Sequence, residues 1–216
     1  MTDKRLNTAS SADNFNSLPT GEINMSKWIS SAVDLVMANF AEFLLLSFIY
    51  VVLLIVASTT FIAALVLGGP LTAGFFYIIF QRMRGNPINI GDLAKGFNFF
   101  IAAMMADILI TVFVSIGFFF LIIPGIVISA LYIFAFPLII EKNMDFWQAM
   151  ETSRKLVTKN IFEFSAFTLL LYIFLFSGVL LLLVGFFVAL PIAFAAIAFA
   201  YKEMIGLEEP ATGSNK

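Results

Sequence analysis

The chain of 216 residues has no cysteine and no histidine, and only 12% of its residues are charged. The absence of cysteine excludes disulfides and thiol chemistry. The chain also lacks a Gly-x-Ser-x-Gly nucleophile elbow, a phosphate-binding glycine loop and any carboxylate cluster with metal-ligand spacing. These absences predict a protein that is not an enzyme, with no catalytic residue, no cofactor and no metal site.

Charge is also missing from three long stretches of the chain. Residues 43–81 and 164–201 contain no charged side chain, and residues 96–140 contain only Asp107. Each stretch is about 40 residues long, and one membrane crossing takes roughly 20 apolar residues, so each fits two crossings joined by a tight turn. With 61% apolar residues overall, a soluble domain is excluded. The predicted fold is an all-α integral membrane protein with six transmembrane helices in three hairpins.

The basic residues predict the orientation of these helices. All twelve Lys and Arg residues lie outside the three stretches, and hairpins bring them to one side of the membrane. The positive-inside rule then places both termini in the cytoplasm. Residues 1–23 and 207–216 are polar and are predicted to be disordered cytoplasmic tails around one membrane domain, 24–206. No basic patch stands clear of the membrane, which excludes nucleic acid as a partner.

The membrane domain contains a predicted parallel internal repeat. Residues 31–85 align with residues 152–206 without a gap, and the identities include Pro70 with Pro191 and Gly85 with Gly206. A third copy with a fainter signal starts near residue 92. Four crossings separate equivalent helices, so the arrangement differs from the inverted repeats of many transporters.

Each clear repeat opens with a predicted amphipathic helix, because apolar residues recur there at spacings of three and four. The apolar faces comprise Met25, Trp28, Ile29, Ala32, Leu35, Val36 and Asn39 in the first repeat, and Phe146, Ala149, Met150, Ser153, Leu156, Val157 and Asn160 in the second. We expect these helices to lie in the membrane interface, with Trp28 and Trp147 at headgroup level.

Prolines predict where the hairpins turn. Pro70, Pro124 and Pro191 lie late in the three stretches, so we expect the chain to turn a few residues earlier, near 63–67, 118–121 and 184–188. Each Pro then occupies the first turn of the returning helix, where its missing N–H costs little. The alternative is a returning helix too short to span, which would thin the bilayer locally.

Asp107 is the only ionisable side chain deep inside a predicted span. Ala103, Asp107, Thr111 and Ser115 form one stripe at spacings of four, so we expect Asp107 to face the bundle interior. Asp107, Thr111 and Ser115 are the candidate intramembrane polar site. Asp107 either binds a proton or cation, or is a protonated anchor for an interhelical hydrogen bond; the second interpretation is favoured, because a transport path usually has several such groups.

Other spans carry hydroxyl pairs: Ser47 with Tyr50, Ser129 with Tyr132, and Thr168 with Tyr172. The candidate partners for Asp107 are Ser47, Tyr77, Ser129, Tyr132 and Tyr172, and the pairs are also candidates for the lining of a ligand pocket. Hydroxyl side chains also line ordinary contacts between membrane helices. Helix packing is the interpretation favoured by the sequence.

A set of local motifs resembles a known group of proteins. The motifs are Leu121-Ile-Ile-Pro-Gly-Ile126, Phe134-Ala-Phe-Pro137, Ala149-x-x-x-Ser153, Gly69-Pro70 and Arg84-Gly85. They resemble the YciC-like prokaryotic inner-membrane proteins and the membrane domain attached to some glycerophosphoryl diester phosphodiesterases, over residues 25–206. The resemblance implies about six helices in a prokaryotic cytoplasmic membrane. It implies no activity, because the phosphodiesterase reaction belongs to a separate soluble domain.

Two functional hypotheses follow from the sequence. The first is a non-enzymatic scaffold or partner subunit, in contact with membrane lipids and with another membrane protein or a second copy of itself. The alternative is a small transporter or channel subunit for a lipid, an ion or a small solute, using Asp107. The first is favoured because catalytic groups are missing, the loops are minimal and the amphipathic helices suit a bilayer surface.

Overall fold

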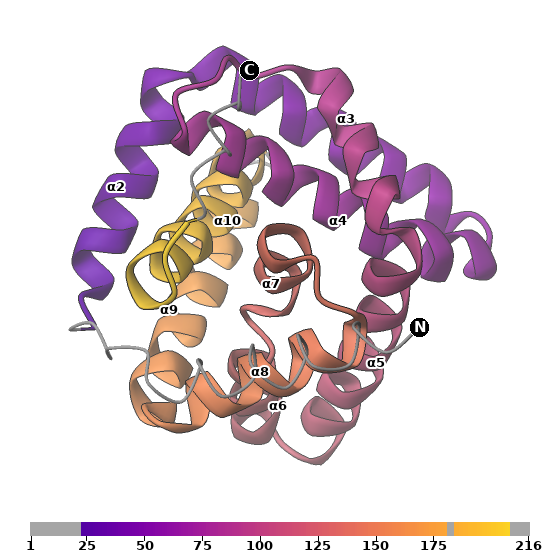
Figure 1. Ribbon diagram of the computed structural model, residues 1–216, viewed down its shortest axis with the longest axis vertical. Helices are drawn as coiled ribbons and strands as arrows, with labels where there is room; N and C mark the ends of the chain where they lie inside the picture. The colour runs from indigo at the N-terminus through magenta and orange to yellow at the C-terminus, as the bar shows by residue number, and fades with distance from the viewer. Residues whose placement is uncertain (1–22, 181–183, 208–216) are drawn as a thin grey trace, which may run out of the picture.

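The computed structural model describes residues 23–180 and 184–207, which form helices and no strand (Figure 1). In chain order the elements are α2 (Met25–Ala38), α3 (Phe40–Ser58), α4 (Phe61–Met83), the 3-10 helix η2 (Ile90–Phe99), α5 (Phe100–Phe120), α6 (Ile122–Leu131), α7 (Ala135–Lys142), α8 (Phe146–Thr158), α9 (Ile161–Leu180) and α10 (Val184–Met204). The predicted tails lie almost wholly outside the described residues.

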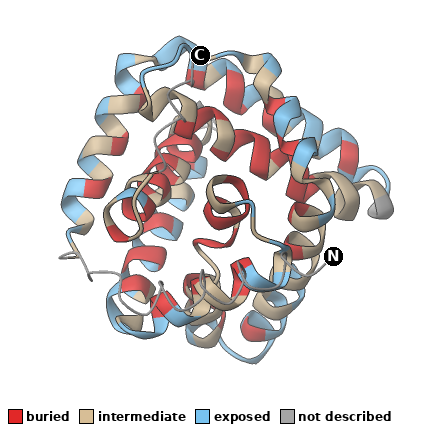
Figure 2. Ribbon diagram, in the orientation of Figure 1, coloured by how far each residue is buried: buried red, intermediate tan, exposed pale blue. Residues whose placement is uncertain are grey.

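Six segments of the described chain are long and apolar enough to cross a membrane. They are α3, α4, η2 with α5, α6 with α7, α9 and α10. The second helix of each hairpin is more buried than the first, so α4, α7 and α10 form the centre of the bundle (Figure 2). The protein is therefore an all-α membrane protein, as the sequence predicted.

Each of the three short helices that precede a hairpin packs against the second helix of another hairpin. The helix η2 packs on α4, α8 packs on α7, and α2 packs on α10. The last of these contacts joins the first described helix to the last one and closes the bundle (Figure 1). The sequence predicted α2 and α8 but not η2. The two predicted repeat segments have the same order of elements, and Gly85 and Gly206 both have positive φ. The duplication itself stays a prediction.

The predicted apolar faces of α2 and α8 are buried against the protein. In α8 the buried residues are Ala149, Met150, Ser153, Leu156 and Val157. In α2 they include Trp28, which is only 1% exposed. The Trp28 ring lies 6.1 Å from the ring of Phe164, and its Nε1 donates to Glu203 at 2.9 Å. Trp28 is therefore covered by protein rather than exposed to lipid headgroups, because a partner for its N–H lets the whole ring be buried. Its depth in the membrane stays a prediction.

The prolines follow the predicted pattern in only one hairpin. The α5–α6 turn is at Leu121, and Pro124 lies in the first turn of α6, as expected. Pro70 and Pro191 instead lie inside α4 and α10, and this prediction is wrong. The first hairpin turns at residues 59–60, earlier than expected. A membrane helix can continue through a proline where neighbouring groups satisfy the freed carbonyl.

The turn predicted near residues 184–188 of the third hairpin is wrong. The helix α10 begins at Val184, so residues 184–188 are helical rather than a turn. Residues 181–183, between α9 and α10, are outside the described residues. Both α4 and α10 are long enough to span the membrane. A short returning helix is therefore unnecessary in either hairpin.

Candidate functional site

The fourth spanning segment is broken in its middle. The helix α6 ends at Leu131, residues 132–134 form a turn, and α7 begins at Ala135. The N–H of Ala135 bonds to the carbonyl of Tyr132 at 3.0 Å rather than continuing the α-helical ladder. Because of the break, the carbonyl of Leu131 and the N–H of Phe134 have no hydrogen-bond partner within the helix. A break at membrane depth is tolerated only where protein or water satisfies such groups.

Ser153 of α8 satisfies both of these backbone groups. Its hydroxyl donates to the carbonyl of Leu131 at 2.7 Å and accepts from the N–H of Phe134 at 3.1 Å. Ser153 is completely buried. On the outer side of α8, the Arg154 guanidinium binds Glu151 and lowers the pKa of its carboxyl below the ordinary value. The helix α8, which is not part of the spanning segment, thus stabilises the break through the hydrogen bonds of Ser153.

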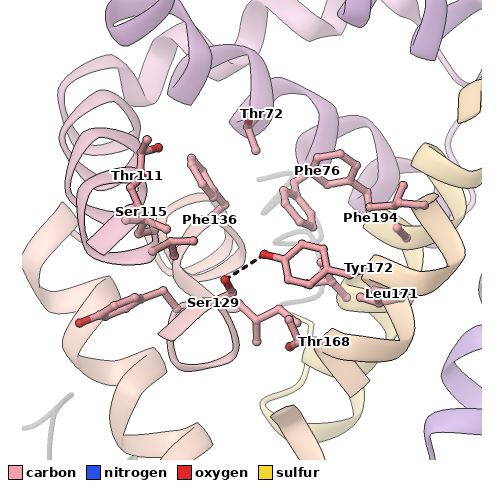
Figure 3. Close-up of a pocket in the computed structure, with 17 residues that line it drawn as sticks. Thr72, Phe76, Thr111, Ser115, Ser129, Phe136, Thr168, Leu171, Tyr172 and Phe194 are labelled. Atoms are coloured by element: carbon pink, nitrogen blue, oxygen red, sulfur yellow. Dashed lines mark hydrogen bonds between the residues drawn. The ribbon is translucent and has the colours of Figure 1, made fainter. Parts of the chain in front are cut away.

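Beside the break lies a cavity of about 370 Å³, which is in the range of sites for small molecules. Figure 3 shows the side chains of α4, α5, α6, α7, α9 and α10 around it. Seven of the 17 lining residues carry hydroxyls, and none is charged. The hydroxyl residues are Thr72, Thr111, Ser115, Ser129, Tyr132, Thr168 and Tyr172. Most of the remaining lining is aromatic or branched aliphatic.

The hydroxyls of the cavity differ in their partners. Tyr172 donates to Ser129 at 2.8 Å, which joins α9 to α6 (Figure 3). Thr72 is hydrogen-bonded to Tyr50 at 3.0 Å. Thr168 is 5% exposed, and its hydroxyl has no hydrogen-bond partner among the described residues. A buried hydroxyl without a partner costs about 1–3 kcal/mol in mutational series. If the Thr168 side chain rotates toward the cavity, a ligand with a hydroxyl or carbonyl group there removes that cost.

The three residues of the predicted polar site do not all lie in the cavity. Thr111 and Ser115 line the cavity, whereas Asp107 is not among the lining residues. The carboxyl of Asp107 packs against Gly68 of α4, where a Cβ would lie 2.7 Å from its Oδ2. Within the part of the chain that the structure describes, Asp107 has no hydrogen-bond partner. The anchor interpretation therefore lacks the hydrogen bond that it requires.

We expect Asp107→Asn to unfold at a higher temperature than the wild type, with a gain of about 1 kcal/mol in the free energy of unfolding. No hydrogen bond is lost, and an ionisable group at membrane depth is removed. Thermal unfolding of the purified protein in neutral detergent measures this. The exposed Asp34→Asn in α2 is the control and should leave the midpoint unchanged. A lower midpoint for Asp107→Asn would instead support the anchor.

The sequence analysis named several of the cavity residues but did not predict that they lie together. Ser129, Tyr132, Thr168 and Tyr172 were interpreted as helix packing, but the structure brings them to one cavity with Thr111. Thr72 was missed, because nothing in its local sequence marks it. Among the described residues no three His, Cys, Asp or Glu side chains lie together as a metal site would require. The chemistry of this site is that of neutral hydroxyls in an apolar wall.

Comparison with protein-family models, curated proteins and solved structures finds no match for this chain. The resemblance to YciC-like proteins and to the phosphodiesterase-associated membrane domain therefore stays a prediction. Function has to be inferred from the cavity and its surroundings.

Proposed function

We propose that this protein binds an uncharged, largely apolar molecule inside the membrane and carries or presents it. The observation that carries the proposal is the uncharged cavity beside the α6–α7 break, with the buried and unpartnered hydroxyl of Thr168 in its wall. Such a wall suits a molecule with an apolar body and a hydroxyl, ester or carbonyl group. Lipids and lipid-soluble metabolites have this chemistry.

Access to the cavity supports a ligand that comes from the bilayer. Three of the lining residues, Thr111, Ser115 and Tyr172, are exposed at the protein surface. Thr111 and Tyr172 lie near the middles of α5 and α9, so the opening is at membrane depth. A discontinuous helix at this depth is a feature of binding sites in membrane transporters. The scaffold hypothesis explains the helices but gives no reason for this cavity.

The location proposed for the protein is a prokaryotic cytoplasmic membrane, with both termini in the cytoplasm. Hairpins bring the ends of α4 and α7 to one side, where Arg84 forms an ion pair with Glu141. At the junction of α2 and α10, Lys27 forms an ion pair with Glu203 at 3.1 Å. This distribution of basic residues supports the orientation through the positive-inside rule.

Filling the cavity should remove the ligand. The side chain of Ala193 on α10 lines the cavity, so Phe at this position would occupy space that the ligand needs. The full-length protein is extracted with its lipids in polymer nanodiscs, and mass spectrometry measures the molecules that co-purify. We expect one neutral amphiphile to be enriched in the wild type and reduced at least ten-fold in Ala193→Phe.

The matched control is Ala166→Phe, which adds the same ring on an exposed position of α9. It should retain the amphiphile at the wild-type level. Equal enrichment in the wild type and in Ala193→Phe would contradict the proposal. A stoichiometric protein partner, with no enriched small molecule, would support the scaffold hypothesis instead.

A further inference from the structure

A second cleft lies where the first turns of α2 meet the last turns of α10. Its volume is about 370 Å³, and it shares no residue with the cavity beside the break. Its lining consists of Lys27, Trp28, Ser31, Phe199, Lys202 and Glu203. With two cations and one anion the cleft has a net positive charge, whereas the cavity beside the break has no charged lining residue.

The one carboxylate of the cleft is already occupied. Glu203 accepts from Lys27 Nζ at 3.1 Å through one oxygen and from Trp28 Nε1 at 2.9 Å through the other. Lys202 is exposed and forms no ion pair with any described residue. The cleft therefore presents an uncompensated ammonium group, with the hydroxyl of Ser31 as a further donor. An anion could bind there without displacing an existing pair.

The position of the cleft limits which anions reach it. Lys202 lies in the last turn of the spanning helix α10, and α2 directly precedes the span that begins at Phe40. The cleft is therefore at the end of the membrane spans, at the level of lipid headgroups. Basic pockets between helices at this level bind the phosphates of anionic lipids. Phe199 adds an apolar wall on the side of the spans.

We propose that this cleft binds the phosphate of an anionic phospholipid, with Lys202 and Ser31 as its direct donors and Lys27 as a supporting charge. The bound lipid lies between α2 and α10 and strengthens the contact that closes the bundle. This lipid differs from the ligand of the inner cavity, since its recognition depends on charge. The proposal stands independently of the proposed function.

The test is a titration of the full-length, delipidated protein in neutral detergent, followed by native mass spectrometry. The probes are phosphatidylglycerol, which is anionic, and phosphatidylcholine, which is zwitterionic. We expect one phosphatidylglycerol to be retained in preference to phosphatidylcholine. Lys202→Gln should weaken this binding about five-fold, since one Lys near a lipid surface contributes about that much. Ser31→Ala should weaken it about two-fold or more.

The matched control is Lys159→Gln, which removes one exposed charge on the segment after α8. It should leave phosphatidylglycerol binding unchanged. An equal loss in Lys159→Gln and Lys202→Gln would overturn the proposal in favour of diffuse surface charge. Complete displacement of the lipid by millimolar inorganic phosphate would also overturn it, because the cleft would then be a site for a free anion. If Lys202→Gln does not fold, Ser31→Ala decides the same question.

Discussion

Gly96→Ala is expected to separate η2 from α4 and to destabilise the protein by about 3 kcal/mol or more. A Cβ on Gly96 would lie 2.0 Å from the carbonyl oxygen of Pro70 and 2.3 Å from the backbone nitrogen of Gly74. The contact is mutual, because a Cβ on Gly74 would lie 2.0 Å from the carbonyl oxygen of Leu93. All of these neighbours are backbone atoms, which cannot move aside as a flexible side chain can. The two helices must therefore move apart.

Thermal unfolding and the yield of monodisperse protein in neutral detergent measure this effect. The control is Gly91→Ala in the same 3-10 helix, where the new Cβ would meet only the side-chain oxygen of Asn89, at 3.2 Å. This oxygen can move by a few tenths of an ångström, so we expect a change below about 1 kcal/mol. Equal stability of the Gly96 and Gly91 variants would show that η2 does not pack on α4 at this distance.

Ser153→Ala is expected to destabilise the protein by about 2–4 kcal/mol, from the loss of partners for two buried backbone groups. The carbonyl of Leu131 and the N–H of Phe134 both depend on the Ser153 hydroxyl. No other hydroxyl of the described chain bonds to either group. Because Tyr132 in the break lines the cavity, the variant should also lose part of the ligand that co-purifies with the wild type.

The control for this prediction is Ser165→Ala on α9. The hydroxyl of Ser165 is buried and has no hydrogen-bond partner among the described residues, so its removal breaks no hydrogen bond. We expect the stability of this variant to equal or exceed that of the wild type. Chemical or thermal unfolding in the same detergent compares the two. A similar small effect for both variants would mean that the break is held by something other than Ser153.

The sequence predicted the spanning segments correctly because a bilayer imposes a simple rule. Every backbone group must be satisfied within a helix, and about 20 apolar residues are needed to cross. The same reasoning identified the buried face of α8, including Ser153, from spacings of three and four. It could not identify the role of Ser153, because the break that the hydroxyl satisfies lies 19 residues earlier in the chain.

The candidate site was only partly predictable. The sequence placed Thr111 and Ser115 on one side of the helix with Asp107. Thr111 and Ser115 line the cavity, but Asp107 lies outside it, against Gly68. A spacing of four places these side chains on one side of α5, but contacts with the other helices decide which part of that side faces the cavity. The sequence named Thr168 only as a hydroxyl paired with Tyr172, because its place in one cavity with Thr111 depends on contacts between helices that are far apart in the chain.

The sequence by itself determined that this chain is an all-α membrane protein with six spans, because apolar length and the absence of charge are local properties of the chain. The tertiary structure alone decided that Pro70 lies inside α4, that Trp28 is buried, and that a cavity forms beside the break. These features depend on contacts between residues far apart in the chain. Such contacts are selected by close packing and by hydrogen bonds to buried groups, which no local pattern records.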